Sequence, residues 1–410
     1  MVLSARYGIA VDLGTTSVSL ALARLSAGAP PRVVASAEAR NAQAPEYGRD
    51  ILSRLSAALG GQELRLRDLA QLQVIELLKQ ACVRAQLGLS EVVAATERVV
   101  VAGNSVMAAL FVGADVSSLA SAPFVAVRDL RCATGPLAQR MGDDPARVTV
   151  LEPLDAFVGG DARAGLIAVG LGTDRGTDAD ADADAESSSS HNNCADIPPG
   201  ARKSTLFIDL GTNTEVVLAR GSQLFVCSAP AGPAFEGGGF KVVGSEVLAD
   251  VADLLRQGVL GVDGKLDERD RRVRRDEGGI AFVRGARCRH AISQRYLRDL
   301  QLAKAATATA LSQVLEAAGT VVAELSRINI AGTFGSALVP DDLVTLGLIP
   351  DMWRDRIRFQ GNASLSGALA VLGGASTDIE SRVTLRSVTL PNSPAFNAAL
   401  IAATDFRWTG

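Results

Sequence analysis

Short apolar runs that end in polar residues alternate along this chain with stretches of helical periodicity. Tyr7 to Val11 and Val18 to Ala23 are two such runs, separated by a short polar turn. Arg98 to Ala102 and Ile328 to Ala331 are two more, and glycine follows each of them. Runs of this length bounded by turn residues predict buried strands.

Apolar residues recur at helical spacing between these runs. One predicted helix carries Leu69, Leu72, Ile75, Leu78, Cys82 and Ala85. A second is capped by Ser293 and carries Leu297, Leu300, Lys304, Leu311 and Leu315. Gly103, Asn104 and Ser105 are predicted to turn into a short helix that ends near Leu110. Strands and helices therefore alternate, which indicates α/β architecture.

The segment from Gly170 to Gly200 is built almost entirely of Gly, Asp, Ala and Ser. It has too little apolar surface to offset its chain entropy, so we expect a mobile linker or surface loop. The whole chain of 410 residues is longer than one core usually holds. We therefore predict a first half at 1–169, a linker at 170–202 and a second half at 203–410.

The two halves begin with the same motif. Asp12-Leu-Gly-Thr-Thr-Ser17 follows the first strand, and Asp209-Leu-Gly-Thr-Asn-Thr214 follows Phe207-Ile208. In both halves an apolar strand resumes after the motif, from Val18 and from Val216. The repeat predicts a β-hairpin used twice, and we call its polar segments turn 1 (residues 12–17) and turn 2 (residues 209–214).

This repeated turn has the chemistry of a polyphosphate site. Glycine lets the backbone approach closely, and successive N–H groups with Thr hydroxyls can surround phosphate oxygens. An Asp at the strand end can hold Mg²⁺ through its water shell, because that ion keeps several waters. The candidates in turn 1 are Asp12, Gly14, Thr15 and Thr16, and those in turn 2 are Asp209, Gly211, Thr212 and Asn213. Asp12 and Asp209 are the predicted magnesium residues, acting through water.

A glycine-flanked turn for adenosine is the third expected element. Gly332, Thr333, Phe334 and Gly335 follow a buried strand and fit it, although an ordinary strand-to-helix loop reads the same way. Two phosphate turns followed by an adenosine turn is the order of the actin, sugar kinase and heat-shock ATPase superfamily. The fold class predicted is thus α/β, with two actin-like (ribonuclease-H-type) domains and a nucleotide cleft between them.

Longer stretches resemble a narrower family, the ATP-dependent reductive activators of corrinoid proteins, in their C-terminal portion. The most specific is Ala231-Gly-Pro-Ala-Phe-Glu-Gly237. The others, in order, are Asn41-Ala-Gln43 with Tyr47-Gly-Arg-Asp50, Gly103 to Met107, Ala122-Pro-Phe124, Phe157 to Asp161, Asp209 to Glu215, Gln301 to Ala305, the turn at Gly332 and Gly361 to Ala368.

The resemblance implies an ATPase that returns cob(II)alamin on a partner corrinoid protein to cob(I)alamin. Family members receive the electron from their own iron–sulfur domain, whose cluster needs closely spaced cysteines. Such a grouping is not found in this sequence, so we expect no iron–sulfur cluster in this chain and a separate low-potential donor such as a ferredoxin. A homodimer is one option for the assembly.

Several polar residues are further candidates for the site. Asp209, Asp161 and Glu236 are predicted catalytic residues that orient water or metal, and Glu215 is a second cleft carboxylate. For Glu215 and Glu236 a solvated or capping role is the alternative. Asn41, Gln43 and Asp50 follow the third strand, where related kinases hold substrates, although Asp50 also fits a helix cap. Lys304 either reaches a phosphate or is simply solvated.

Composition narrows the possible partners. The formal net charge is −4, which gives no general attraction to nucleic acid or to anionic membranes. The five cysteines are scattered without a C-x-x-C, so reduced thiols and a cytoplasmic location are expected. Two rival functions stay open: a small-molecule kinase of the same superfamily, and a non-catalytic nucleotide-gated binding module.

Overall fold

The structure is a computed structural model that describes residues 5–48, 50–171, 204–237, 244–287, 291–332 and 338–408. The predicted linker falls almost wholly outside the described residues, as do Thr333, Phe334 and Gly335 of the predicted adenosine turn. Among the helices of the described residues, none is both long and apolar enough to cross a membrane.

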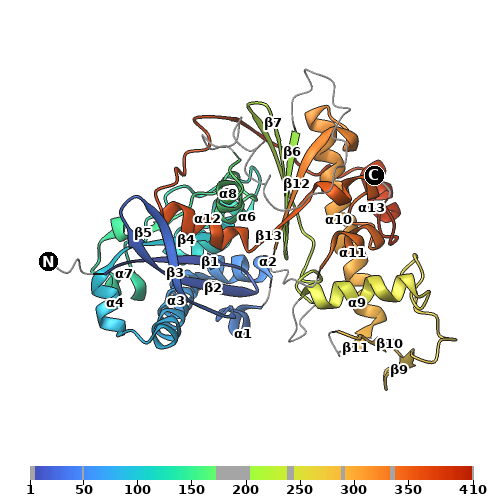
Figure 1. Ribbon diagram of the computed structural model, residues 1–410, viewed down its shortest axis with the longest axis horizontal. Coiled ribbons are helices and arrows are strands. Elements are labelled where there is room, and N and C mark those ends of the chain that lie inside the picture. The colour runs from blue at the N-terminus through green and yellow to red at the C-terminus, as the bar shows by residue number, and fades with distance from the viewer. Residues whose placement is uncertain are drawn as a thin grey trace, which may run out of the picture.

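The first half is built on a five-stranded sheet in the order β3-β2-β1-β4-β5 (Figure 1). Its strands are β1 (Arg6–Leu13), β2 (Ser17–Ser26), β3 (Ala29–Arg40), β4 (Thr96–Gly103) and β5 (Val148–Val150). Its helices are α1 (Ala44–Tyr47), α2 (Ile51–Ala57), α3 (Glu63–Ala85), α4 (Leu89–Ala95), α5 (Ser105–Val112), α6 (Ser117–Ala120), α7 (Pro136–Arg140) and α8 (Gly160–Ala168). A π turn, η1 (Ala58–Gln62), and a 3-10 turn, η2 (Pro145–Arg147), complete it.

The second half has a six-stranded sheet in the order β13-β12-β6-β7-β8-β14. Its strands are β6 (Ser204–Leu210), β7 (Thr214–Arg220), β8 (Gln223–Ala229), β12 (Leu325–Ala331), β13 (Ile357–Gly361) and β14 (Thr384–Ser387). A small sheet holds β9 (Arg274–Arg275), β10 (Ala281–Arg284) and β11 (Ala291–Ser293). The helices are α9 (Gly244–Arg256), α10 (Gln294–Ala318), α11 (Pro340–Thr345), α12 (Ala363–Leu372) and α13 (Pro394–Ala402), with 3-10 turns η3 (Val322–Glu324) and η4 (Asp351–Arg356).

The two large sheets repeat one topology. In each, three consecutive strands pair antiparallel, and two later strands add in parallel beside the first strand of the three. The order β3-β2-β1-β4-β5 thus corresponds to β8-β7-β6-β12-β13, with β14 added at one edge. The predicted hairpins at β1–β2 and β6–β7 are confirmed, and so is the α/β fold class.

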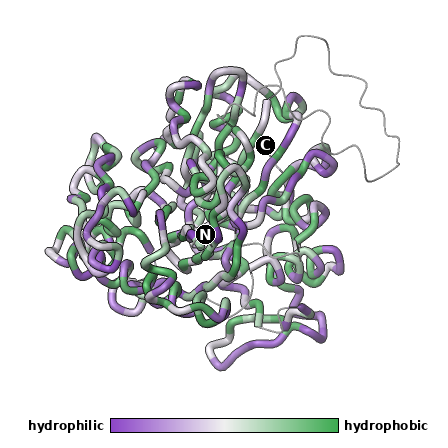
Figure 2. The backbone as a smooth tube through the Cα atoms, turned by 60° about the vertical axis from the view of Figure 1, so that its left-hand side comes forward, coloured by the Kyte–Doolittle hydropathy of each residue, from purple (hydrophilic) through white to green (hydrophobic). Residues whose placement is uncertain are grey.

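Two helices join the halves. α8 and α12 pack side by side between the large sheets (Figure 1), and α12 contacts β1 and β4 although it follows β13 in the chain. One apolar cluster spans this region, with Ala10 and Val100 from the first sheet and Phe207 and Val217 from the second. Figure 2 shows hydrophobic and hydrophilic stretches alternating along the backbone. This shared core connects the two sheets.

Some helix predictions needed correction. α10 does begin after the cap Ser293, whose hydroxyl accepts from the N–H of Tyr296. In α3, however, the predicted face is confirmed only in part: Ile75, Leu78 and Cys82 are buried, but Leu72 is 48% exposed and Leu69 is half-buried. The residues that pack inward include Leu66, Ala70, Val74, Leu77 and Ala81.

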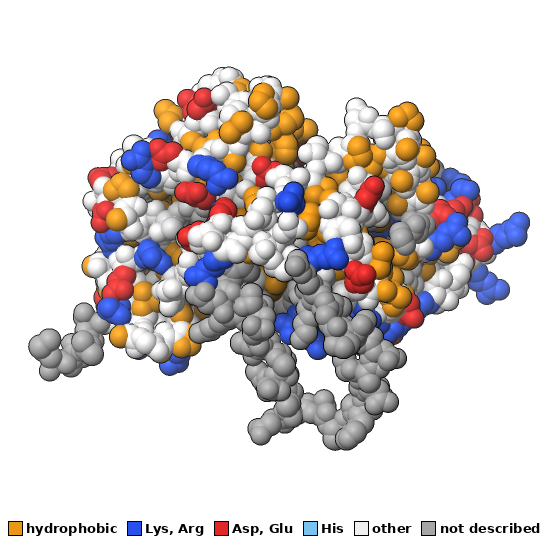
Figure 3. Space-filling model, turned by 90° about the horizontal axis from the view of Figure 1, so that it is seen from above, with side chains coloured by type: hydrophobic (Ala, Val, Ile, Leu, Met, Phe, Trp, Pro, Cys, Tyr) orange, Lys and Arg blue, Asp and Glu red, His pale blue; other side chains and the backbone are white. Residues whose placement is uncertain are grey.

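Charged side chains of both signs are interspersed on the face of the molecule seen in Figure 3. Cys82, Cys132 and Cys227 are free and buried, as expected for reduced thiols. Burial also raises the pKa of Cys132 to about 11 and that of Cys227 to about 12. These thiols are packing residues rather than nucleophiles.

Candidate functional site

Turn 1 and turn 2 meet at the ends of β1 and β6. The hydroxyl oxygens of Thr16 and Thr212 lie 3.3 Å apart. A cleft of about 680 Å³, part of it open to solvent, lies where the two turns face each other. It is lined by Asp12, Gly14, Thr15, Thr16, Ser17, Asn104, Asp161, Asp209, Leu210, Gly211, Thr212, Asn213, Glu215, Glu236, Gly332, Asn362, Ala363 and Ser364.

Hydrogen bonds from neighbouring side chains stabilise the backbone conformation of turn 1. Asn41 donates from Nδ2 to the Gly14 carbonyl at 2.7 Å, and its backbone N–H donates to the Thr16 carbonyl at 2.9 Å. A methyl group on Gly14 would lie 2.6 Å from the Ser17 carbonyl oxygen, so the turn needs glycine there. Asn104, the N-cap of α5, donates to the Thr15 hydroxyl at 3.0 Å.

The predicted residues after β3 have structural roles: Asn41 supports turn 1, Gln43 bonds the backbone of α3 and Asp50 caps α2. Asn41 bonds turn 1, and Gln43 is buried and donates to the Leu66 carbonyl at 2.8 Å. Asp50 is the N-cap of α2 and accepts from the N–H of Ser53, as the helix-cap alternative predicted. The backbone and side-chain hydrogen bonds from Ser53 hold the pKa of the Asp50 carboxyl below its usual value.

Turn 2 is held differently. The carboxylate of Glu236 accepts from both the N–H and the hydroxyl of Thr212, at 2.8 and 2.9 Å. The Thr212 carbonyl accepts from the N–H of Gly232 at 2.7 Å. Glu236 thus occupies two donors of the turn that an incoming anion would otherwise use.

Several carboxyl groups line the cleft together, of which Glu215 is buried and Asp12, Asp161 and Asp209 are half-buried. Burial raises the pKa of Asp209 to about 8, and the nearby charges of Asp161, Asp12 and Glu236 add to it. Burial likewise raises the pKa of Asp161 to about 7, with a further contribution from Asp12. Glu215 lies opposite Asp209 on β7 and accepts from the Ser228 hydroxyl at 3.2 Å, and burial raises its pKa as well. Such a group of like charges favours a bound cation.

Asp12 is held from the far end of the chain. Asn362, the N-cap of α12, donates to Asp12 Oδ2 at 2.8 Å, and the Ser364 hydroxyl donates to Oδ1 at 2.9 Å. Burial still raises the pKa of Asp12, because these two hydrogen bonds only partly compensate for lost water.

Asn362 and Ser364 were not among the site residues predicted from the sequence. The signal was present in the stretch Gly361–Ala368, which supplied part of the family resemblance.

The described part of the chain holds no group of three or more His, Cys, Asp or Glu side chains placed to bind a metal directly. Both oxygens of Asp12 already accept hydrogen bonds, which suits a carboxylate that contacts an ion through water. The structure thus leaves the predicted water-mediated role of Asp12 and Asp209 as a prediction.

The predicted adenosine turn is described only at its first residue. Gly332 lines the cleft with a φ of 133°, a backbone conformation that favours glycine, and its N–H donates to the Gly361 carbonyl at 3.1 Å. It directly follows β12, the strand expected to precede this turn. The roles of Thr333, Phe334 and Gly335 remain predictions.

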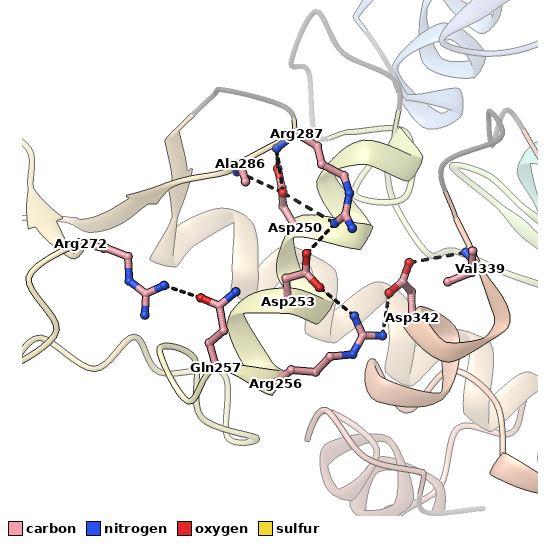
Figure 4. Close-up of polar contacts among 9 residues, drawn as sticks. All are labelled: Asp250, Asp253, Arg256, Gln257, Arg272, Ala286, Arg287, Val339 and Asp342. Atoms are coloured by element: carbon pink, nitrogen blue, oxygen red, sulfur yellow. Dashed lines mark hydrogen bonds and ion pairs between the residues drawn. The ribbon is translucent and has the colours of Figure 1, made fainter.

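A chain of ion pairs braces α11, the helix that follows this turn (Figure 4). Arg256 on α9 bonds Asp342 of α11 at 2.7 Å and Asp253 at 2.8 Å. Asp253 also pairs with Arg287 at 2.7 Å, and the buried Asp250 accepts from the N–H groups of Ala286 and Arg287. The network ties α9 both to α11 and to the loop after β10.

Lys304 neither reaches the cleft nor lies in solvent, so both predictions for it were wrong. The side chain is 1% exposed, and its ammonium donates to the carbonyls of Ala403, Asp405 and Arg407 at 2.6–2.9 Å. Burial lowers the pKa of Lys304 to about 8. It anchors the segment after α13 rather than a phosphate.

The duplicated sheet, the two facing turns and the aspartates that line the cleft define a protein of the actin-like class with a cleft between two domains. Comparison with known families narrows this class. Residues 7–174 match the RACo middle region, and residues 203–242 and 241–409 match the C-terminal domain of RACo, the ASKHA domain. The second match alone covers about half of the chain, so the chain belongs to the RACo family.

Two known proteins show how similar this chain is to members of the family. The corrinoid activation enzyme RamQ of Eubacterium limosum is 26% identical over 412 residues, covering 88% of this chain and 63% of that protein. The chain thus spans less than two thirds of this relative. The solved structure of a reductive activator for corrinoid,iron-sulfur protein superposes with a TM-score of 0.80 and 24% identity, covering 99% of this chain and 67% of that one. This likeness shows the fold, and the family resemblance seen in the sequence is confirmed.

Proposed function

We propose that this protein binds ATP with Mg²⁺ between turn 1 and turn 2 and uses its hydrolysis to assist reductive activation of a corrinoid protein. The observation that carries the proposal is the meeting of the two turns, with the Thr16 and Thr212 hydroxyl oxygens 3.3 Å apart and with the half-buried carboxyl groups of Asp12 and Asp209 lining the same cleft. Backbone N–H groups and hydroxyls would surround the phosphates there. Membership of the RACo family supports the corrinoid branch.

Each cleft residue has a proposed role. Asp12 and Asp209 would hold the water shell of Mg²⁺, and the ion would in turn keep their carboxyl groups ionised. Asp209, Asp161 and Glu236 are the proposed catalytic residues, which orient the attacking water. Positioning and charge stabilisation would carry most of the phosphoryl-transfer chemistry. Gly332 and the residues after it would contact the adenosine.

The electron must come from a redox group. The sequence printed here holds no cysteine grouping suited to an iron–sulfur cluster, so we propose that a low-potential carrier such as a ferredoxin supplies it from outside these 410 residues. One electron then converts cob(II)alamin to cob(I)alamin on the partner, while ATP and water give ADP and phosphate. Both partners and the free thiols suit a cytoplasmic setting.

The experiment that tests the function measures ATP hydrolysis with and without a cob(II)alamin-bearing corrinoid protein. We expect slow hydrolysis by the chain alone and faster hydrolysis with the partner, because partner binding would favour the closed cleft. Asp209→Asn should abolish the stimulated rate, whereas Asp129→Asn should not, since Asp129 is exposed and pairs with Arg131.

The fate of the γ-phosphate separates the alternatives. Its transfer to a small alcohol or acid would replace the activator proposal with a kinase. ATP binding without turnover, whether or not the corrinoid protein is present, would replace it with a nucleotide-gated binding module.

A further inference from the structure

Arg54 lies directly behind turn 1, outside the residues that line the cleft. It belongs to α2 and its side chain is fully buried, at 0% exposure. Nη2 donates to the Thr15 carbonyl at 2.7 Å and to the Gly48 carbonyl at 3.2 Å, and Nη1 contacts Met107 Sδ at 3.1 Å. One guanidinium therefore links turn 1, the loop before α2 and α5.

Within the part of the chain that the structure describes, the positive charge of Arg54 is not neutralised by an ion pair. Among the described residues, no carboxylate lies within salt-bridge distance of it, and its Nε–H has no acceptor. Asp50 acts only at longer range, and both of its oxygens accept from Ser53. Burial lowers the pKa of Arg54 to about 10, so the group remains cationic at neutral pH. An unpaired buried charge is costly, which points to a role for it.

The geometry of the peptide bond gives that role. A trans peptide is planar, and its C=O and N–H point in opposite directions. Because the Thr15 carbonyl is turned toward Arg54, the N–H of Thr16 on the same peptide is turned away from it. The described residues offer that N–H no acceptor, and Thr16 lines the cleft. A hydrogen bond from a cation to the carbonyl also polarises the peptide and strengthens its N–H as a donor.

Turn 2 has no such cation behind it among the residues described. The corresponding Thr212 carbonyl accepts from an uncharged backbone N–H, that of Gly232, at 2.7 Å. The N–H of Thr212 itself is bonded by the Glu236 carboxylate. The two turns repeat in sequence, yet turn 1 is backed by a positive charge and turn 2 is bonded by a negative one.

We propose that Arg54 is a positioning residue that fixes the Thr15–Thr16 peptide and supplies positive potential for the terminal phosphates of a nucleoside triphosphate. The inference rests on the nucleotide binding proposed above. It adds a specificity: Arg54 should favour nucleotides in proportion to their phosphate charge and should leave the nucleoside contacts unchanged.

The test is calorimetric titration of the full chain with Mg-ATP, Mg-ADP and AMP. Arg54→Met should weaken ATP binding by about tenfold or more, weaken ADP binding less and leave AMP binding unchanged. Arg54→Gln removes the charge but keeps a shorter polar side chain in the buried position, and it should also lower the ATP-to-AMP affinity ratio. ATP affinity should fall less steeply with salt in both variants, because one interacting charge has been removed.

Arg147→Met is the matched control. Arg147 also donates to backbone carbonyls of the first half, those of Met141 and Val93, but lies away from the cleft. Its loss should leave the ATP-to-AMP ratio as in the wild type. Thermal melting checks that each variant is folded, and Arg54→Gln carries the test if Arg54→Met is not. An equal loss of affinity for all three nucleotides, or none, overturns the inference. A wild-type chain that binds none of them overturns the proposed function and this inference with it.

Discussion

At the scale of single residues, the cleft has a large effect on the pKa of Asp209. Its carboxyl group is removed from water and faces Asp161, Asp12 and Glu236, so its proton is held until about pH 8. The motif in the sequence identified Asp12 and Asp209 as a pair, because both follow an apolar strand and precede Leu-Gly-Thr. It could not give their protonation, which depends on groups brought together from both halves.

The pKa of Asp209 makes stability depend on pH. The carboxyl has a reference pKa of 3.8 and a folded pKa of about 8, so the folded protein binds this proton more tightly. The resulting stability is complete below the reference value and is lost as pH rises through the folded pKa. The melting temperature of the metal-free protein should therefore fall between about pH 5 and about pH 8, and fall less in Asp209→Asn. Equal slopes in the two proteins would contradict the assignment.

Glu236 should compete with a bound anion. Its carboxylate occupies the N–H and hydroxyl of Thr212, so a phosphate that uses these donors has to displace it. We expect Glu236→Gln to bind Mg-ATP more tightly by a few-fold, since an amide is a weaker competitor. Its turnover should drop if the freed carboxylate orients water. Titration together with hydrolysis rates measures both effects, and weaker ATP binding in this variant would refute the competition.

At the scale of elements, the crossing of α8 and α12 positions several side chains of the cleft. α8 carries Asp161 near its start, and α12 begins at Asn362, which bonds Asp12. The helices approach so closely that a methyl group on Gly367 would lie 1.9 Å from the Ala164 carbonyl oxygen. Glycine at this crossing therefore lets α8 and α12 pack closely, which places Asp161 and Asn362 at the same cleft.

Gly367→Ala should push α12 away from α8. We expect a loss of about 1–3 kcal/mol in the free energy of unfolding and weaker Mg-ATP binding, because Asn362 and Ser364 would move from Asp12. Gly60→Ala is the control: a methyl group there would contact nothing within 4 Å. Chemical denaturation and titration measure the two effects. Wild-type values for Gly367→Ala would show that the crossing tolerates a larger separation.

The ion pairs of α9 support a separate prediction. Asp342 is buried and bonds Arg256, so Asp342→Asn replaces one of the two carboxylates that pair with the guanidinium by an uncharged amide. We expect a loss of about 1–3 kcal/mol in the free energy of unfolding. Asp351→Asn should be nearly neutral, since Asp351 is 75% exposed where it pairs with Arg354. Similar effects of both substitutions in denaturation experiments would mean that the network does not brace α11.

Local sequence predicted the strands, hairpins and helix caps better than the long-range contacts between side chains. Hairpins, the Ser293 cap and the strand before Gly332 follow from a few neighbouring residues, and all three are observed. The bond from Asn362 to Asp12 spans 350 residues, so no local pattern could reveal it. Lys304 was expected near phosphate or water because a lysine on a helix usually is, yet three carbonyls near the end of the chain hold it buried.

At the scale of the whole molecule, two copies of one sheet share a core and meet at a cleft. The cluster containing Ala10, Val100, Phe207 and Val217 joins the sheets behind the two turns. Closure of this cleft on nucleotide would change the relative position of the halves, and a partner that contacts both would sense it. In this way ATP binding could be linked to an event on another protein.

The formation of cob(I)alamin tests this account most directly. An anaerobic mixture would contain the chain, a cob(II)alamin-bearing corrinoid protein, a reduced low-potential donor such as a ferredoxin, and Mg²⁺. Adding ATP should shift the cobalt absorbance from cob(II)alamin to cob(I)alamin with the wild type and with Asp129→Asn, but not with Asp209→Asn. Cobalt absorbance that stays unchanged with ATP, or that shifts to the same extent without it, would contradict ATP-driven corrinoid activation.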